Sequence, residues 1–259
     1  MSSGVRPLIV IAGVGNGSGT GGATARLFAK QGYRVALIAR GPDKLKKVVD
    51  DVVAASSGAE VAAFPVESYG NQDMTDAFTA IKAYQWPSGG ATEIRVALYN
   101  ASSGVRGPFL DTTYERLRRM LDRTIEGAFA FSRHVIEEFQ TNEPDEKGKR
   151  GTLLFTGATS STRGNVMTSA FAAGKSAVRA LSQSLNKEFG PQNIHVAHMI
   201  LDGPVLVDFH VATYGEPFKN NPDIRLDPES IAMGYLYLVN QDRSAWTWEL
   251  DLRPAHEKW

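Results

Sequence analysis

Short apolar runs alternate with longer segments of helical periodicity along the chain. The first run, Leu8 to Ala12, is unbroken and rich in β-branched residues, the pattern of a strand buried on both faces. Further strands are predicted at residues 33–39, 60–66, 94–99, 152–156, 194–200 and 246–252. Helices are predicted from Gly22 onward and at residues 44–55, 73–84, 113–139 and 168–188, with a last helix before the final strand. This alternation predicts one α/β domain over residues 1–259, with a doubly wound parallel sheet of about seven strands and helices on both faces.

A glycine-rich turn separates the first predicted strand from the first helix. Glycine permits positive φ and lets a ligand approach the backbone with no Cβ in the way. The backbone N–H groups at the start of the following helix are unpaired and carry partial positive charge, which suits a pyrophosphate. The strand–turn–helix order therefore predicts a dinucleotide site. Its residues are Gly15, Asn16, Gly17, Ser18, Gly19, Thr20 and Gly21.

The end of the second predicted strand indicates which nucleotide is bound. A free ribose 2′-hydroxyl usually meets Asp or Glu at this place, whereas this chain has Ala39 followed by Arg40. Arginine makes forked, charge-assisted hydrogen bonds to phosphate. The sequence therefore favours NADP(H) over NAD(H), and the alternative is that Arg40 is only a solvated charge at the strand end.

Composition excludes several classes of function. Lys plus Arg equals Asp plus Glu at 28 each, so neither nucleic acid nor an anionic membrane is expected as a partner. The absence of cysteine excludes disulfides and thiolate metal sites. No metal site is expected, because His195 and His198 alternate with apolar residues and are predicted to be strand residues. The chain has no apolar run long enough for a bilayer, and its first residues lack a signal-peptide core, so a cytoplasmic protein is predicted.

The order of these strands, helices and motifs resembles that of the short-chain dehydrogenase/reductase family over nearly the whole length of the chain. Gly15-x-x-x-Gly19-x-Gly21 fits the glycine motif of that family. The resemblance implies a Rossmann fold, a nicotinamide nucleotide, a small-molecule substrate and a homodimer or homotetramer. Beyond the glycine turn and Arg40, the cofactor-binding residues that it implies are Glu67, Ser68, Asn100, Ala101, Ser102, Lys175, Gly203 and Val205.

The catalytic positions depart from the pattern of the family. The family has a tyrosine four residues before its lysine, and this chain has Phe171 there. The position of the family's serine is Ala158, and the asparagine of the long helix is replaced by Thr124. The catalytic residues that the resemblance and their positions indicate are Lys175, Thr159 and Ser160.

A phenylalanine at the tyrosine position removes the proton donor that carbonyl reduction needs. General acid catalysis is typically worth roughly 10²–10⁴-fold, so another acid is required. Further candidates by position are Asp202, His210 and Tyr214. All three lie in residues 202–228, a proline-containing segment that is predicted to be an irregular insert forming a substrate lid.

Three functional hypotheses follow from these residues. The favoured one is an NADP(H)-dependent oxidoreductase acting on a small organic carbonyl, enone or imine. The second is a catalytically inactive NADP-binding sensor or scaffold, and the third is a non-redox enzyme built on the same fold. Arg163, in the loop expected to border the active site, either binds an anionic substrate group, orients the loop or is solvated.

Overall fold

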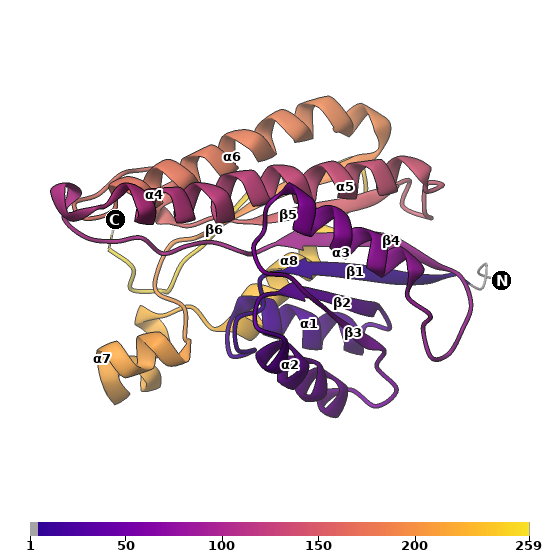
Figure 1. Cartoon of the computed structure of the whole chain (residues 1–259), viewed down its shortest axis with the longest axis horizontal. Helices are drawn as coiled ribbons and strands as arrows, with labels where there is room; N and C mark the ends of the chain where they lie inside the picture. The colour runs from indigo at the N-terminus through magenta and orange to yellow at the C-terminus, as the bar shows by residue number, and fades with distance from the viewer. Residues whose placement is uncertain (1–4, 259) are drawn as a thin grey trace.

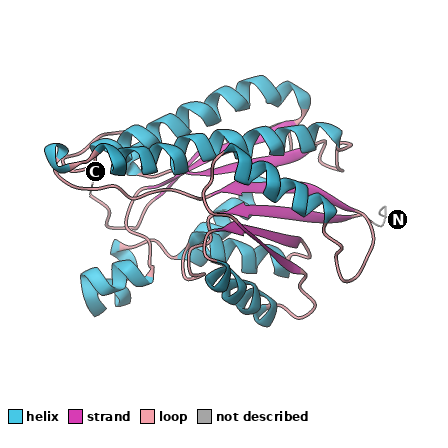
Figure 2. Ribbon diagram, viewed as in Figure 1, coloured by secondary structure: helices cyan, strands magenta, loops and turns pink. Residues whose placement is uncertain are grey.

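The apolar runs form one parallel sheet in the computed structural model, which describes residues 5–258 (Figures 1 and 2). Its strands are β1 (Arg6–Ala12), β2 (Arg34–Ala39), β3 (Val61–Pro65), β4 (Thr92–Tyr99), β5 (Gly151–Thr156), β6 (Ile194–Leu201) and β7 (Glu249–Leu252). They are ordered β3-β2-β1-β4-β5-β6-β7, and every neighbouring pair is parallel. The prediction of a seven-stranded doubly wound sheet is therefore confirmed. The strand order reverses between β1 and β4, so their carboxyl ends flank the crevice where such folds bind ligands.

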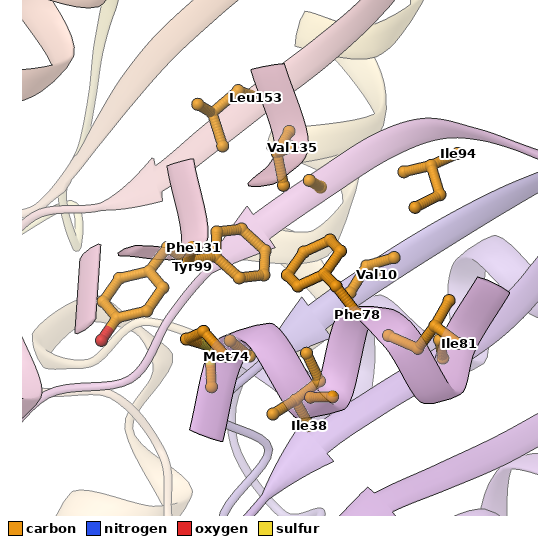
Figure 3. Close-up of a cluster of buried hydrophobic side chains, with 14 of the residues drawn as sticks. Val10, Ile38, Met74, Phe78, Ile81, Ile94, Tyr99, Phe131, Val135 and Leu153 are labelled. Atoms are coloured by element: carbon orange, nitrogen blue, oxygen red, sulfur yellow. The ribbon is translucent and has the colours of Figure 1, made fainter. Parts of the chain in front are cut away.

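Two helical layers cover the sheet and enclose separate apolar cores (Figure 1). One layer contains α3 (Asn71–Ala83), α5 (Gly127–Thr141) and α6 (Ser169–Phe189). The other contains α1 (Thr20–Lys30), α2 (Pro42–Ala55) and α8 (Pro228–Asn240). In the first core Phe78 and Phe131 pack edge to face with ring centroids 5.6 Å apart, beside Tyr99 at the end of β4 (Figure 3). Tyr99 is a packed strand end, and its hydroxyl donates a hydrogen bond to the Arg123 carbonyl at 2.5 Å.

The long helix predicted at residues 113–139 is interrupted by one wider turn. It consists of α4 (Tyr114–Leu121), a π-helical turn (Asp122–Glu126) and α5. Such turns insert one extra residue into a helix and are frequent near functional sites. Thr124 lies in this turn, is buried, and accepts a hydrogen bond from the Ser103 N–H at 3.4 Å.

The segment 202–228 is more ordered than predicted. It contains the helix α7 (Asp208–Asn220) and a short 3₁₀ turn (Pro222–Ile224), so the expectation of an irregular insert is wrong. Gly215 breaks α7 at φ 74°, and Pro217 follows in the first turn of the second helical piece, where a missing N–H costs no hydrogen bond. In Figure 1 α7 stands apart from both helical layers, beside the carboxyl ends of the strands.

The last strand is shorter than predicted, because it begins at Glu249 rather than near Trp246. Trp246 instead stacks on His195 of β6 with ring centroids 4.9 Å apart, and Trp248 packs against the Arg179 guanidinium at 5.4 Å. His195 and His198 are buried strand residues, as predicted. Among residues 5–258, no helix combines the length and the apolar content that a bilayer crossing requires.

Candidate active site and nucleotide-binding turn

The glycine turn between β1 and α1 is packed so closely that side chains are excluded at three positions. A Cβ on Gly22 would overlap the Gly17 carbonyl oxygen. A Cβ on Gly13 would lie 2.5 Å from the Ala101 nitrogen, and one on Gly21 would lie 2.5 Å from the Gly13 carbonyl oxygen. Asn100 holds the turn in place, since its side-chain amide donates to that same carbonyl at 2.6 Å. Gly21 and Asn100 were expected at this site, and Gly13 is the first glycine of the same run; the residues that follow β4 are what leave no room for a side chain there.

The first turn of α1 is free to receive an anion. The helix begins at Thr20, Gly19 precedes it without a side-chain cap, and no acidic residue lies in its first turn. The unpaired N–H groups of a helix start attract negative charge. These features fit a pyrophosphate, because the glycines leave room beside donors that no side chain satisfies.

A cavity of about 540 Å³ lies between this turn and the end of β2. It is lined by Gly15, Asn16, Arg40, Gly41, Asp43 and Lys44. The fold therefore brings the predicted Arg40 together with the glycine turn, and adds the ammonium of Lys44 on α2. Burial raises the pKa of the neighbouring Tyr69, with Arg40 acting in the opposite direction. Arg40 and Lys44 outnumber the one carboxylate in the lining, Asp43, and forked, charge-assisted donors such as Arg40 suit a phosphate.

Glu67 and Ser68 follow β3 but do not line this cavity. The Ser68 N–H donates to the Asp73 carboxylate at 2.8 Å, and its hydroxyl donates to the same oxygen. Ser68 therefore binds the first turn of α3 through Asp73, and the Glu67 side chain is exposed.

A second cavity of about 660 Å³ lies beyond the carboxyl ends of β5 and β6. The predicted site residues that line it are Ser102, Thr159, Ser160, Lys175, Gly203 and Val205. Side chains from α6 and α7 complete its wall, among them Phe171, His210 and Tyr214. Residues far apart in the sequence thus meet at one end of the sheet.

Lys175 is buried in the wall of this cavity, with 5% of its surface exposed. Its ammonium donates to the Thr156 carbonyl oxygen at 2.8 Å, and burial lowers the pKa of Lys175 to about 8. The Thr156 hydroxyl donates to Asn100 Oδ1 at 2.8 Å. Asn100 in turn holds Gly13. A continuous polar chain therefore joins Lys175 to the glycine turn.

Phe171 precedes Lys175 by one turn of α6, and its ring centroid lies 5.9 Å from the Lys175 ammonium. The Arg106 guanidinium lies 5.4 Å from the same ring centroid. Arg106 was not identified from the sequence. It lies in an irregular loop after β4, and only the fold of that loop brings it to α6.

Asp202, one of the candidate proton donors, is 1% exposed and already bound on both oxygens. The Thr159 hydroxyl donates to one oxygen. The other lies 2.8 Å from Arg253 and 3.4 Å from Arg163. Arg253 follows β7, and no spacing in the sequence relates it to Asp202. The hydrogen of the Thr159 hydroxyl is directed to Asp202 and away from the cavity.

The hydrogen-bond partner of His210 Nδ1 shows which ring nitrogen carries the hydrogen. Its Nδ1 lies 2.7 Å from the Val205 carbonyl oxygen, and since a carbonyl only accepts, Nδ1 carries the hydrogen. Nε2 is the ring nitrogen that this bond leaves available. Tyr214, one turn further along α7, is 52% exposed, and its ring centroid lies 5.7 Å from that of His210.

Comparison with known proteins matches residues 9–212 to the short chain dehydrogenase family. A short-chain dehydrogenase from Rhodopseudomonas palustris has a similar structure, with a TM-score of 0.76 and 28% identity over 96% of this chain and 98% of that one. The 3-oxoacyl-(acyl-carrier-protein) reductase MabA of Mycobacterium tuberculosis is 26% identical over 200 residues, 75% of this chain and 68% of that protein.

An alcohol dehydrogenase from the archaeon Thermococcus sibiricus, complexed with 5-hydroxy-NADP, shares the fold with a TM-score of 0.79 at 20% identity over 98% of both chains. The family match covers most of the chain, and the sheet order, the glycine turn and the lysine of α6 lie within it. The chain therefore belongs to the short chain dehydrogenase family of oxidoreductases.

Proposed function

We propose that the protein is an NADP(H)-dependent oxidoreductase of a small organic carbonyl, enone or imine, with Phe171 in place of the tyrosine of the family. The buried ammonium of Lys175 carries this proposal. Burying a charge is costly unless it is hydrogen-bonded, and an ammonium has three donors, of which the Thr156 carbonyl takes one. Ribose hydroxyls of a nucleotide in the adjoining cavity supply the missing acceptors.

The residues that would hold the nucleotide come from three places. The glycine turn and the start of α1 receive the pyrophosphate, and Arg40 with Lys44 receives the 2′-phosphate. Lys175 receives the nicotinamide ribose. A bound nicotinamide supplies or accepts hydride. The related T. sibiricus enzyme, whose structure contains 5-hydroxy-NADP, supports NADP(H) as the nucleotide.

Carbonyl reduction also requires a proton, and the chain must provide it without a tyrosine. Phe171 has no hydroxyl, and the Thr159 hydroxyl donates to Asp202. His210 lines the cavity with Nδ1 held by the Val205 carbonyl, so that its imidazolium form carries a transferable proton on Nε2. We therefore assign His210 as the proton donor and α7 as the lid that carries it.

Arg40→Ala is expected to remove the preference for the phosphorylated nucleotide. A charge-assisted bond to phosphate is worth about 1.5–3 kcal/mol, so the NADPH Kd should rise by about ten- to a hundredfold while the NADH Kd stays unchanged. Calorimetric titration of both nucleotides measures this. Arg118→Ala, an exposed arginine on α4, is the matched control. Equal binding of both nucleotides by the unmodified protein would contradict the choice of NADP(H).

His210→Gln is expected to lower kcat/KM for NADPH-dependent reduction by about 10²–10⁴-fold. The glutamine amide cannot give up a proton in place of the imidazole, whereas NADPH binding should stay unchanged. The measurement is the rate of NADPH oxidation with an activated ketone, together with calorimetric titration of NADPH. Tyr214→Phe, which removes the other candidate proton donor of α7, should keep the activity. A His210→Gln variant with unchanged kcat/KM would show that another group donates the proton.

The same assay separates the two other hypotheses. An inactive sensor or scaffold binds NADPH but consumes none with any carbonyl, enone or iminium compound of a broad panel. A non-redox enzyme converts its substrate without a change in nicotinamide absorbance. The proposed oxidoreductase consumes NADPH in proportion to product.

A further inference from the structure

We infer that the cavity beside Lys175 binds a substrate that bears a carboxylate, and that Arg106 is its anchor. This inference rests on the proposed function, since it names the substrate class of that same site. Three observations carry it: the balance of charge around the cavity, the free hydrogen-bonding capacity of Arg106, and the ring on which its guanidinium packs.

Cations predominate in the lining of the cavity. Among the described residues, those with permanent basic side chains are Arg106, Arg163, Lys175 and Lys258, and the carboxylate is Glu257. The buried carboxylate of Asp202 lies behind Arg163 and does not line the cavity. A cavity with this imbalance attracts an anion and repels a cation.

Arg106 differs from the other arginines near the cavity in having no acidic partner. Arg163 and Arg253 bind Asp202. Within residues 5–258, the Arg106 side chain contacts the Phe171 ring and makes no ion pair with a carboxylate, and its backbone carbonyl accepts a hydrogen bond from Arg116. The N–H donors of its guanidinium are therefore available to a ligand.

Phe171 determines how that guanidinium is presented. A guanidinium packs on an aromatic face through cation–π attraction, and its edge keeps the N–H fork that matches a carboxylate in two parallel hydrogen bonds. Both cations lie near this ring, since the Arg106 guanidinium is 5.4 Å and the Lys175 ammonium 5.9 Å from its centroid. An apolar ring at this position thus contributes to anion binding, where a hydroxyl would contribute to proton transfer.

The test is calorimetric binding of paired acids and amides to the protein saturated with NADP⁺. Benzoate is compared with benzamide, and 4-phenylbutanoate with its primary amide. The unmodified protein should bind each acid more tightly than its amide. Arg106→Gln should weaken acid binding by about ten- to a hundredfold without changing amide binding. Arg106→Lys should keep part of the preference, and Arg118→Gln should keep all of it.

Two results would overturn the inference. One is an unmodified protein that shows no preference for acids over amides, including one that binds neither across the panel. The other is an Arg106→Gln variant with an unchanged preference. Titration of NADPH into the same samples separates failure of this inference from failure of the proposed function. An unmodified protein that does not bind NADPH contradicts the proposed function, whereas one that binds NADPH without preferring acids contradicts only the carboxylate inference.

Discussion

Lys175→Met is expected to raise the stability of the protein while it disables the nucleotide site. Burial lowers the pKa of Lys175 from 10.5 to about 8, which corresponds to about 3 kcal/mol of unfavourable free energy for the charged form in the folded state. The lost hydrogen bond to the Thr156 carbonyl offsets about 1 kcal/mol of this. Methionine fills a similar volume, so the free energy of unfolding at pH 7 should rise by about 2 kcal/mol. The NADPH Kd should rise by about ten- to a hundredfold.

The pH dependence of unfolding gives an independent check on this prediction. Between about pH 8 and pH 10.5 the unfolded chain keeps a proton on Lys175 that the folded state has released. Stability therefore rises with pH in this window, and the advantage of the variant should disappear there. Urea unfolding at pH 7 and pH 10 measures both effects. A variant that is less stable at pH 7, or that binds NADPH normally, would refute the assignment of Lys175 as a costly, ligand-binding ammonium.

Glu60→Gln is expected to destabilise the opposite end of the sheet by about 3 kcal/mol at pH 7, because it leaves a buried cation without its partner. Arg34 is fully buried, and its Nε lies 2.9 Å from Glu60 Oε2. Arg6 binds the same oxygen at 2.5 Å, and the Ser88 N–H donates to Oε1 at 2.7 Å. Urea unfolding of the variant measures the loss. Glu137→Gln, in the exposed Arg133–Glu137 pair, is the control and should cost less than about 1 kcal/mol.

The pH dependence of stability in acid should reveal the contribution of the Glu60 carboxylate. Burial alone would raise the pKa of Glu60, but hydrogen bonds from the Ser88 N–H and from Arg34 lower it to about 2. The stabilisation is fully present above the unfolded value of 4.5 and is lost as pH falls toward 2. The free energy of unfolding of Glu60→Gln should change less with pH over this range than that of the unmodified protein. Parallel curves of unfolding free energy against pH for the two proteins would show that Glu60 contributes nothing specific to folding.

The cofactor half of the site could be predicted from the sequence because its residues are close together in the chain. The residues from Leu8 to Arg40 contain a strand, a turn, a helix and a second strand, and local patterns determine each of these. Parallel pairing of β1 with β2 then places Arg40 beside the glycine turn. The sequence did not indicate that Ser68 binds Asp73 of α3, because that bond depends on the fold of the turn after β3.

The substrate half could not be predicted in the same way. Arg106 meets Phe171 only because a loop after β4 reaches α6. Asp202 is bound by Arg253, which follows the last strand. The helix in residues 208–220 was missed because Gly215 and Pro217 interrupt its periodicity, although each is compatible with a helix that breaks and restarts.

The sequence by itself determined the parallel sheet, the glycine turn and the position of Arg40 at the end of the second strand, because these depend on periodicity and on neighbours along the chain. The tertiary structure alone decided which polar groups are free. Thr159 and Asp202 are hydrogen-bonded to each other. The guanidinium of Arg106 packs on Phe171 and His210 binds through Nδ1, which leaves the Arg106 N–H donors and His210 Nε2 available to a ligand. Hydrogen-bond partners are set by distances between segments that lie as far as 203 residues apart in the sequence, and loop conformation contributes to those distances.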